Sequence, residues 1–537
     1  MIPSLLKNLC ARHTFGRLAT TPSSQGISPE AQTALDLLLT GQLDQCEQTL
    51  KLQQAHEAAD PGAHFLYLVT LHHRLAVLEP EFSDVALTPG VLQVARQIIA
   101  HGLAHGDWEL ALAAITPLPH WLAATAEGRA LLSHGLFALR QQMDTQQFLS
   151  LLGAWLLSQG DTDAAVLCAK CLRPGTTGSW LCLTATTPLP QYCHAHRLPC
   201  LGDSHEPMQV IGSGVTSSQS TFMCKLPEGR VLGHTFLPVS ADNHVFLAGC
   251  LHNPFKILAG KRPAHLESIA LATSTHLLAH VHPGQRHAGE YALLGGHPNF
   301  GHWLLNHFSR LMFIDRYPHS DRLRYIVSDT LPPVAWQMLD RAGIESARLH
   351  AVGQHSMPTF EHLWVPSMPF GADSQRRLCW LPSALHFVRQ RLRLRFDAPR
   401  TRKLFITRAN AQWRRLANER DIVTALKPFG FEVCDPGQMN LEQQIELAAA
   451  TRILVTPFGA GANLHMFCAT GVPVIELQHP LIAGTMDLLP SSTAVLDQPF
   501  KRIIGPVTAG SCQTLDQDYV VSVRSVTETV SDFLQDG

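Results

Sequence analysis

The chain has 537 residues, more than one hydrophobic core usually holds, so about two to four domains are expected. Hydrophobic residues make up 45%, charged residues 16%, and the formal net charge is -2. This balance indicates a globular chain, and the absence of any Lys- or Arg-rich run gives no reason to expect nucleic acid as a partner.

Residues 1–27 are expected to be a flexible N-terminus. Lys7, Arg12 and Arg17 occur there without an acidic residue, as in targeting peptides, but no long apolar core follows. No apolar stretch reaches the roughly 18 residues of a membrane span. The 13 cysteines are odd in number and scattered, which favours reduced thiols. We therefore expect a cytoplasmic protein, and a peripheral association with the inner membrane stays open.

Residues 28–175 are rich in Ala, Leu and Gln and carry helical periodicity. Gly41, Gly106 and Gly160 each precede an acidic helix start. This pattern resembles tetratricopeptide-type helical hairpins, although the spacing is irregular and a non-repeating helical domain remains the alternative. Either domain would serve packing or bind a protein partner. Residues 176–204 follow as a linker, since Pro, Gly and Thr are frequent up to residue 190.

From about residue 205 onward, short apolar runs alternate with amphipathic helices, which predicts an α/β fold with parallel sheets. The first lobe, 205–395, has expected strands at 244–248, 291–294, 325–327 and 363–365, and helices at 301–316, 333–342 and 383–396. The second lobe, 396–537, has expected strands at 403–407, 431–434, 453–456 and 472–477, and helices at 418–429 and 440–452. Gly430 would end one helix, and Asn440 with Gln443 would cap another. The fold class is therefore two Rossmann-like lobes, with a cleft between them, after an all-α helical-repeat domain.

The segment from Thr456 to Phe467 reads as a strand, a turn of small residues and a helix start. The turn contains Gly459, Ala460 and Gly461, which would let a ligand approach the backbone, and a helix N-terminus attracts anions. Glu476 is expected at the carboxyl end of the next strand, where open α/β sheets bind ligands. The alternative is a tight Gly-rich turn without a ligand.

Further polar residues are expected on the same rim of the second sheet. Arg408 follows the first strand, and Arg415, Asn418 and Glu419 stand at the next helix start. Guanidinium groups suit a diphosphate and a carboxylate suits ribose hydroxyls. The alternative is that Arg414, Arg415 and Glu419 form a solvated charged face.

In the first lobe, a Gly-containing loop leads into a helix with His302 and Asn306 at positions i and i+4. Both would lie on one face, and His302 would act as general base or orient a substrate hydroxyl. His297 and His307 are close in sequence, but no carboxylate or cysteine completes a metal site. For most of these histidines a structural role is the alternative.

No metal ion is expected. Asp161 and Asp163 form a DxD sequence at a helix start, where capping explains them. Cys168 and Cys171, with Cys182, Cys193, His194, His196 and Cys200 downstream, would fit a metal knuckle or a redox pair. Their helical spacing favours buried thiols instead.

Residues 290–480 resemble glycosyltransferase family 61, of the capsular-polysaccharide type. The matching pieces occur in the family's order at 299–306 (NFGHWLLN), 310–311 (RL), 407–408 (TR), 415–419 (RLANE), 430–433 (GFEV), 442–445 (EQQI), 459–463 (GAGAN), 467 (F) and 474–477 (VIEL). The resemblance implies two lobes of the GT-B type and inverting transfer of a sugar from a nucleotide sugar. It further implies that Arg408, the turn at 459–463 with Asn463, and Glu476 hold the nucleotide.

The expected donor is UDP- or GDP-linked and needs no metal cofactor, and the acceptor is a hydroxyl of a glycan, a lipid-linked sugar or a protein. The resemblance places the chain in polysaccharide biosynthesis, with residues 28–175 available to a protein partner. Two positions depart from the family pattern. Phe458 stands where the family has His, and Asn306 stands where it has Asp or Glu. The alternative function is therefore a catalytically weakened scaffold that binds partners through its helical domain.

Overall fold

The computed structural model describes residues 29–39, 162–172, 178–185, 189–209, 216–246, 269–272, 276–353, 355–372, 378–412, 414–479, 488–508 and 517–535, together with separate positions between 42 and 157. The chain forms two compact units. One contains residues 1–185 and 252–281, and the other contains residues 186–251 and 282–537. Among the described residues, no helix has the length and apolar character that crossing a bilayer requires.

The described part of the first unit contains helices α2 (Pro29–Leu39) and α9 (Thr162–Leu172) and strands β1 (Ser179–Ala185) and β6 (Ile269–Ala272). Both strands pair antiparallel with the first residues of β7 (His276–Gly295). The N-terminus at 1–27 and the three glycines behind the helical-repeat prediction lie outside the described residues.

The segment 176–204, expected as a linker, contains regular structure. It holds β1, helix α10 (Leu189–Ala195) and the start of β2. The apolar run from Trp180 to Leu183 finds backbone partners in β7, from His280 back to Leu277. A strand partner distant in sequence thus overrides the local Pro, Gly and Thr content.

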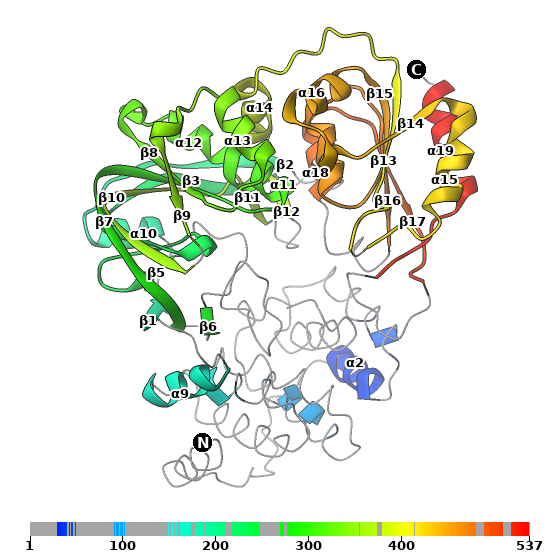
Figure 1. The fold of residues 1–537 in the computed structure, drawn as a ribbon. Coiled ribbons are helices and arrows are strands. Elements are labelled where there is room, and N and C mark those ends of the chain that lie inside the picture. Colours follow the sequence, from blue (N-terminus) through cyan, green and yellow to red (C-terminus); the bar gives the residue numbers. More distant parts are fainter. Residues whose placement is uncertain are drawn as a thin grey trace. The chain divides into compact units, whose positions relative to one another are not determined.

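The first lobe of the second unit is built on a mixed sheet (Figure 1). Its further strands are β2 (Cys200–Gln209), β3 (Thr216–Leu232), β4 (Leu237–Val239), β5 (His244–Val245), β8 (Arg324–Ser328), β9 (Leu349–Val352) and β10 (Ser356–Pro366). Strands β10, β7, β8 and β9 are parallel neighbours, as predicted. Strands β2, β4 and β10 pair antiparallel with β3, so this lobe is only partly Rossmann-like.

The helices of this lobe are α11 (Phe300–His302), the π-helical segment η7 (Trp303–His307), the 3-10 segment η8 (Phe308–Arg310), α12 (Leu311–Asp315), α13 (Pro333–Arg341) and α14 (Pro382–Arg391). The first four follow one another without a break, where a single helix over 301–316 is predicted. Shorter elements are η3 (Gly233–Thr235), η9 (Ser320–Arg322), η10 (Ser346–Arg348) and the pair β11 (Phe370–Ala372) and β12 (Leu378–Trp380). The expected lobe boundary at 395–396 falls between α14 and the next strand.

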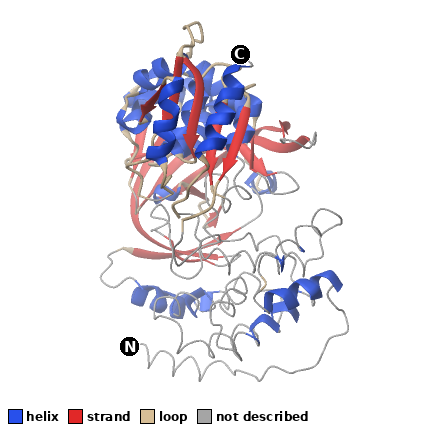
Figure 2. Ribbon diagram, turned by 90° about the vertical axis from the view of Figure 1, so that its right-hand side faces the viewer, coloured by secondary structure: helices blue, strands red, loops and turns tan. Residues whose placement is uncertain are grey.

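The second lobe has a fully parallel sheet, as the strand–helix alternation predicts. Its spatial order is β14 (Phe431–Cys434), β13 (Arg402–Ile406), β15 (Thr451–Pro457), β16 (Val474–Gln478) and β17 (Phe500–Ile504). The helical elements are α15 (Glu419–Leu426), η11 (Lys427–Phe429), η12 (Pro436–Gln438), α16 (Leu441–Ala449), η13 (Ala460–Phe467), α18 (Leu488–Val495) and α19 (Val523–Gln535). Figure 1 shows α15 and α19 on one face of the sheet and α16 and α18 on the other. Figure 2 shows helices and strands interleaved in this α/β part of the molecule.

Two predicted local signals of this lobe are confirmed. Gly430 ends the helical segment in the left-handed conformation, with φ 76°. Asn440 and Gln443 form a reciprocal capping box at the start of α16, with Asn440 accepting from the Gln443 N–H at 2.9 Å. Both features depend only on neighbouring residues, so the sequence displays them directly.

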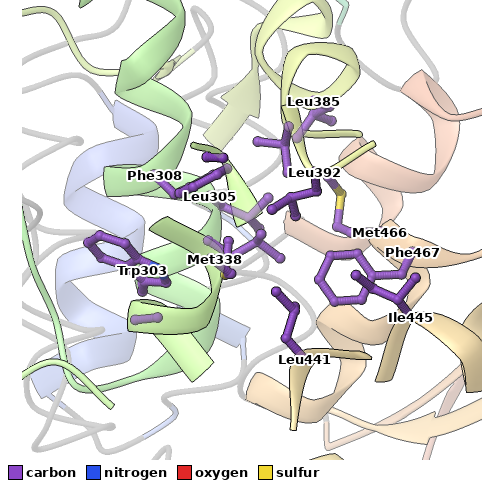
Figure 3. Packing of buried hydrophobic residues seen from close by; sticks show 14 of the residues in the cluster. Trp303, Leu305, Phe308, Met338, Leu385, Leu392, Leu441, Ile445, Met466 and Phe467 are labelled. Atoms are coloured by element: carbon purple, nitrogen blue, oxygen red, sulfur yellow. The ribbon is translucent and has the colours of Figure 1, made fainter. Parts of the chain in front are cut away.

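The two lobes of the second unit share one hydrophobic core (Figure 3). The first lobe contributes Trp303, Leu305, Phe308, Met338, Leu385 and Leu392, and the second contributes Leu441, Ile445, Met466 and Phe467. Polar contacts join the same surfaces, because Arg389 donates to the carbonyls of Met466 and Cys468 at 3.0 and 2.6 Å. Burial lowers the pKa of Arg389 to about 10, and its charge is compensated by these carbonyl dipoles. The lobes are therefore packed as one body rather than tethered by a linker.

Candidate functional site

The order of the parallel sheet marks where a ligand would bind in the second lobe. Numbered along the chain, its strands lie in the order 2-1-3-4-5, so the direction of winding reverses between β13 and β15. Open α/β sheets bind ligands outside the carboxyl ends of strands at such a reversal. Arg408 follows the end of β13, and Gly459 follows the end of β15. Two residues predicted for the site thus come from the two strands that flank the reversal.

Arg408 and Gly459 are in direct contact. A Cβ placed on Gly459 would collide with the Arg408 guanidinium, so only glycine leaves room for that side chain. Arg408 Nε also lies 3.4 Å from the carbonyl oxygen of Arg414. Burial lowers the pKa of Arg408, while nearby Tyr519 and Glu419 oppose the shift, and the guanidinium remains a cation. The site therefore holds a positive charge against the turn at 459–463.

Glu419 orients the chain around Arg408. One carboxylate oxygen accepts from the Arg408 N–H at 3.0 Å, and the other accepts from the hydroxyl of Thr407. The carboxylate thereby fixes the turn that follows β13. In this arrangement Glu419 supports the position of Arg408 through the backbone.

Asn418 and Arg415 attach the same loop to the C-terminal segment. Asn418 donates to the Val521 carbonyl at 2.8 Å and accepts from the Val521 N–H at 3.2 Å. Arg415 Nε and Nη2 donate to Asp518 at 2.9 and 2.6 Å. The structure thus brings both residues close to Arg408 in the chain fold, while their side chains are engaged with residues 518–521. No local pattern predicts this pairing, because more than a hundred residues separate the partners.

The turn at 459–463 contacts the first lobe at the start of the composite helix, the unbroken run of α11, η7, η8 and α12. Asn463 Nδ2 donates to the Ala460 carbonyl at 2.9 Å, which closes the first turn of η13. A Cβ on Gly301 would lie 2.5 Å from the same Nδ2 atom. Gly301 therefore permits close approach of the two lobes immediately before His302. Sequence reasoning placed no functional weight on Gly301.

The composite helix positions His302 and Asn306 as predicted. Asn299 caps it by accepting from the N–H groups of Gly301 and His302 at 2.9 and 3.3 Å. His302 Nδ1 lies 3.3 Å from Asn306 Oδ1, so the expected shared face is confirmed. The segment from Trp303 to His307 is π-helical, a geometry that occurs often at functional sites.

The surroundings of His302 favour the neutral imidazole. Burial lowers the pKa of His302, the charge of Arg414 lowers it further, and the hydrogen bond to Asn306 opposes both effects. Arg414 in turn lies over the Phe458 ring, 5.4 Å from its centroid. Phe458 thus holds a second cation beside His302, at the position where a histidine was expected from the family pattern. Because Asn306 Oδ1 can only accept, it favours a proton on Nδ1 and a lone pair on Nε2.

The neighbouring histidines have different environments. His297 packs its ring against His302, with centroids 4.7 Å apart. His307 is buried, and burial together with Arg310 holds its pKa well below the ordinary range. In the described part of the chain, no group of His, Cys, Asp and Glu residues is arranged to hold a metal ion.

Glu476 lies in the middle of β16 rather than at its carboxyl end, and its side chain is fully buried. Its Oε2 accepts from Arg502 Nε at 2.8 Å, directly across the β16–β17 pairing. Tyr519 packs nearby and donates to the Leu477 carbonyl at 2.7 Å. Burial raises the pKa of Tyr519, while the charge of Arg408 opposes this shift. Tyr519 thus lies near both Arg408 and Glu476, and it was missed by sequence reasoning.

Most of these residues lie in a segment that matches a protein-family model. Residues 300–475 match the Glycosyltransferase 61 model, a segment that includes His302, Asn306, Arg408 and the turn at 459–463 and ends one residue before Glu476. A search of curated proteins found no match. The part of the chain that carries the site is therefore similar to a glycosyltransferase family.

Proposed function

We propose that the second unit transfers a sugar from a nucleotide sugar to a hydroxyl group, with inversion at the anomeric carbon. The contact of Gly301 with Asn463 carries this proposal. It joins the helix start that bears His302 to the turn that lies against Arg408. A base for the acceptor and a cation for the leaving group are thereby neighbours in one packed body.

The donor side would be the turn at 459–463 together with Arg408 and Arg414. Two guanidinium groups and the N-terminus of η13 are suited to a diphosphate. The charge on the leaving diphosphate grows in the transition state, so fixed cations there lower the barrier. The burial of Arg408 strengthens this effect, because water screens a buried charge less. We propose that UDP or GDP binds here without a metal cofactor.

The acceptor side would be His302. Its pKa is lowered by burial and by Arg414, so at neutral pH the imidazole is available to take a proton. The Asn306 oxygen would hold Nδ1–H and leave Nε2 facing the acceptor hydroxyl. Deprotonation of a hydroxyl that attacks opposite the leaving group gives inversion. The acceptor would be a glycan, lipid-linked sugar or protein hydroxyl.

Titration calorimetry with UDP and GDP tests the donor side. Arg408→Ala should weaken the better-bound nucleotide roughly ten- to hundredfold, the value of a hydrogen bond to a charged group. Arg415→Ala is the matched control, since Arg415 is paired with Asp518 and should change the affinity little. Equal affinities in the wild type and Arg408→Ala would exclude this nucleotide site.

Turnover of nucleotide sugars tests the acceptor side. His302→Ala should abolish transfer and leave the nucleotide affinity unchanged. Normal turnover by His302→Ala would exclude it as the base. Nucleotide binding by the wild type without any transfer or hydrolysis would instead favour the scaffold function, for which Asn306 and Phe458 are the motivating residues.

A further inference from the structure

Three cysteines of the first lobe meet where β2 pairs with β3, and none of them belongs to the site described above. Cys224 Sγ lies 3.0 Å from Cys200 Sγ, and Cys193 on α10 is within hydrogen-bonding reach of the same Cys224 sulfur. All three are reduced thiols in the structure. At Cys168 and Cys171 the sequence favours buried thiols over a redox pair, and Cys168 is buried.

The backbone around Cys200 and Cys224 suits a disulfide. The two residues are direct partners in the antiparallel pairing of β2 with β3. The Lys225 N–H donates to the Pro199 carbonyl at 2.9 Å, which identifies Cys200 and Cys224 as a non-hydrogen-bonded pair. In such pairs the Cα atoms are about 4.5 Å apart, within the range that a disulfide spans. A bond between them therefore needs no movement of the strands.

The three thiols differ in access to solvent. Cys193 and Cys224 are fully buried, whereas Cys200 is partly exposed. An external oxidant would therefore reach Cys200 first. Cys224 would then act as the resolving thiol, since it is the sulfur in contact with Cys200.

We propose that Cys200 and Cys224 form a reversible disulfide when the protein meets a low-molecular-weight disulfide such as oxidised glutathione. The Cys200 thiolate attacks one sulfur of the oxidant, forming a mixed disulfide and releasing one glutathione thiolate. The Cys224 thiolate then attacks Cys200 Sγ and expels the second glutathione thiolate. The two cysteine protons end on the two released thiols, so the protein loses two electrons and glutathione gains them.

The second step should be the slow one. Hydrogen bonding with the neighbouring thiols, and after it burial, raises the pKa of Cys224 above its ordinary value, so little thiolate is present at neutral pH. Below that pKa the thiolate fraction rises about tenfold for each pH unit. The mixed disulfide on Cys200 should accordingly be transient at pH 8.5 and longer-lived at pH 7.

Peptide mass spectrometry of the full chain tests this proposal. The protein is incubated with oxidised glutathione, remaining thiols are blocked with N-ethylmaleimide, and peptides are compared with and without reduction. We expect a cross-linked peptide that joins Cys200 to Cys224 and disappears on reduction. Cys200→Ser should abolish it, while Cys182→Ser, which removes another partly exposed strand thiol, should leave it.

Melting temperature gives a second readout that does not depend on the variants. Oxidation should raise the melting temperature of the wild type, because the disulfide closes a loop of the chain, and reduction should restore the original value. The proposal is overturned if Cys200 stays glutathionylated at pH 8.5 without a cross-link. A cross-link from Cys224 to Cys193, or full alkylation of both Cys200 and Cys224 after oxidation, would also overturn it.

Discussion

The guanidinium of Arg408 lies against the Cα atom of Gly459, so each residue determines what the other can be. The Arg408 guanidinium occupies the space that a Cβ atom at position 459 would need, so position 459 accepts only glycine while Arg408 lies there. Their contact connects the ends of β13 and β15, the two strands between which the direction of winding reverses. An anion at this position would contact both the Arg408 guanidinium and the backbone of the turn at 459–463.

Gly459→Ala should therefore displace Arg408 and weaken UDP or GDP binding about tenfold or more, the cost of losing a charge-assisted hydrogen bond. The fold should persist, because the collision is with a side chain. Calorimetry measures the affinity, and Gly353→Ala serves as control, since a Cβ there meets only the flexible Asp329 carboxylate at 3.3 Å. Unchanged affinity in Gly459→Ala would show that this contact does not shape a nucleotide site.

Asn306→Asp should raise the pKa of His302, because a carboxylate stabilises the imidazolium where an amide does so weakly. The base must be neutral to act, so the acid limb of the rate profile should move to higher pH. Asn306→Ala removes a hydrogen bond that raises this pKa, and the limb should then move to lower pH. The pH dependence of kcat/KM measures both shifts. Profiles that coincide with the wild type would separate His302 from the ionisation that controls the rate.

Glu476→Ala should cost about 3–5 kcal/mol of unfolding free energy, because it leaves the partner of a buried ion pair uncompensated. Replacing both partners, as Glu476→Leu with Arg502→Leu, should recover most of that loss. Urea unfolding measures both values. If Glu476→Ala is as stable as the wild type but binds nucleotide poorly, the carboxylate belongs to the ligand site and not to the support beneath it.

His465 should make the protein sensitive to acid. It is fully buried between Gln498 and Ser492, and burial lowers its pKa from 6.5 to about 4. The unfolded chain takes up this proton below pH 6.5 and the folded chain does not, so stability is lost as the pH falls from 6.5 to about 4. At about 1.4 kcal/mol per pKa unit, the loss is about 3 kcal/mol.

His465→Gln should flatten the dependence of unfolding free energy on pH over that interval. Val495→Ala, a substitution without a titratable group on α18, should lower the whole curve and keep its slope. Urea unfolding at several pH values distinguishes the two. Equal slopes in the wild type and His465→Gln would assign the acid sensitivity to other groups.

The second lobe was largely predictable because its signals are local. Strands β13, β15 and β16 contain apolar runs beside amphipathic helices, and Gly430 and Asn440 mark helix ends in their own neighbourhood. The expected strand at 431–434 coincides with β14. Burial on both faces makes the central strands β15 and β16 mainly apolar, so their positions can be predicted without knowledge of their partners. Strand β14 at the edge of the sheet is partly exposed, and Gly430 marks its start instead.

The first lobe was less predictable because its long strands depend on distant partners. Only the last apolar residues of β7, 291–294, were expected as a strand, since Pro283, Gly284 and Gly289 interrupt the pattern. Pairing with β1, β10 and β8 in turn keeps the strand continuous over its whole length. The π-helical segment after His302 likewise has no periodic signature, because it changes the hydrogen-bond register and not the residue types.

For the candidate site, residue types were predictable but their roles were not. The order of the motifs predicts Arg408, the turn at 459–463 and His302 as site residues, and the structure places them near one another. Glu419 and Asn418 carry the polar groups that a ligand site needs, yet backbone groups of Arg408 and Val521 occupy them. Only the fold shows which polar side chains already have protein partners.

The common interior of the two lobes has a consequence for the reaction itself. Phe300, two residues before His302, packs its ring 6.3 Å from that of Phe467, at the far end of the short helix that begins beside Gly459. This hydrophobic packing therefore sets the distance between His302, which would take the proton, and Arg408, which would stabilise the leaving diphosphate. Truncating Phe300 or Phe467 to alanine would therefore change the turnover rate, although neither side chain would contact a substrate.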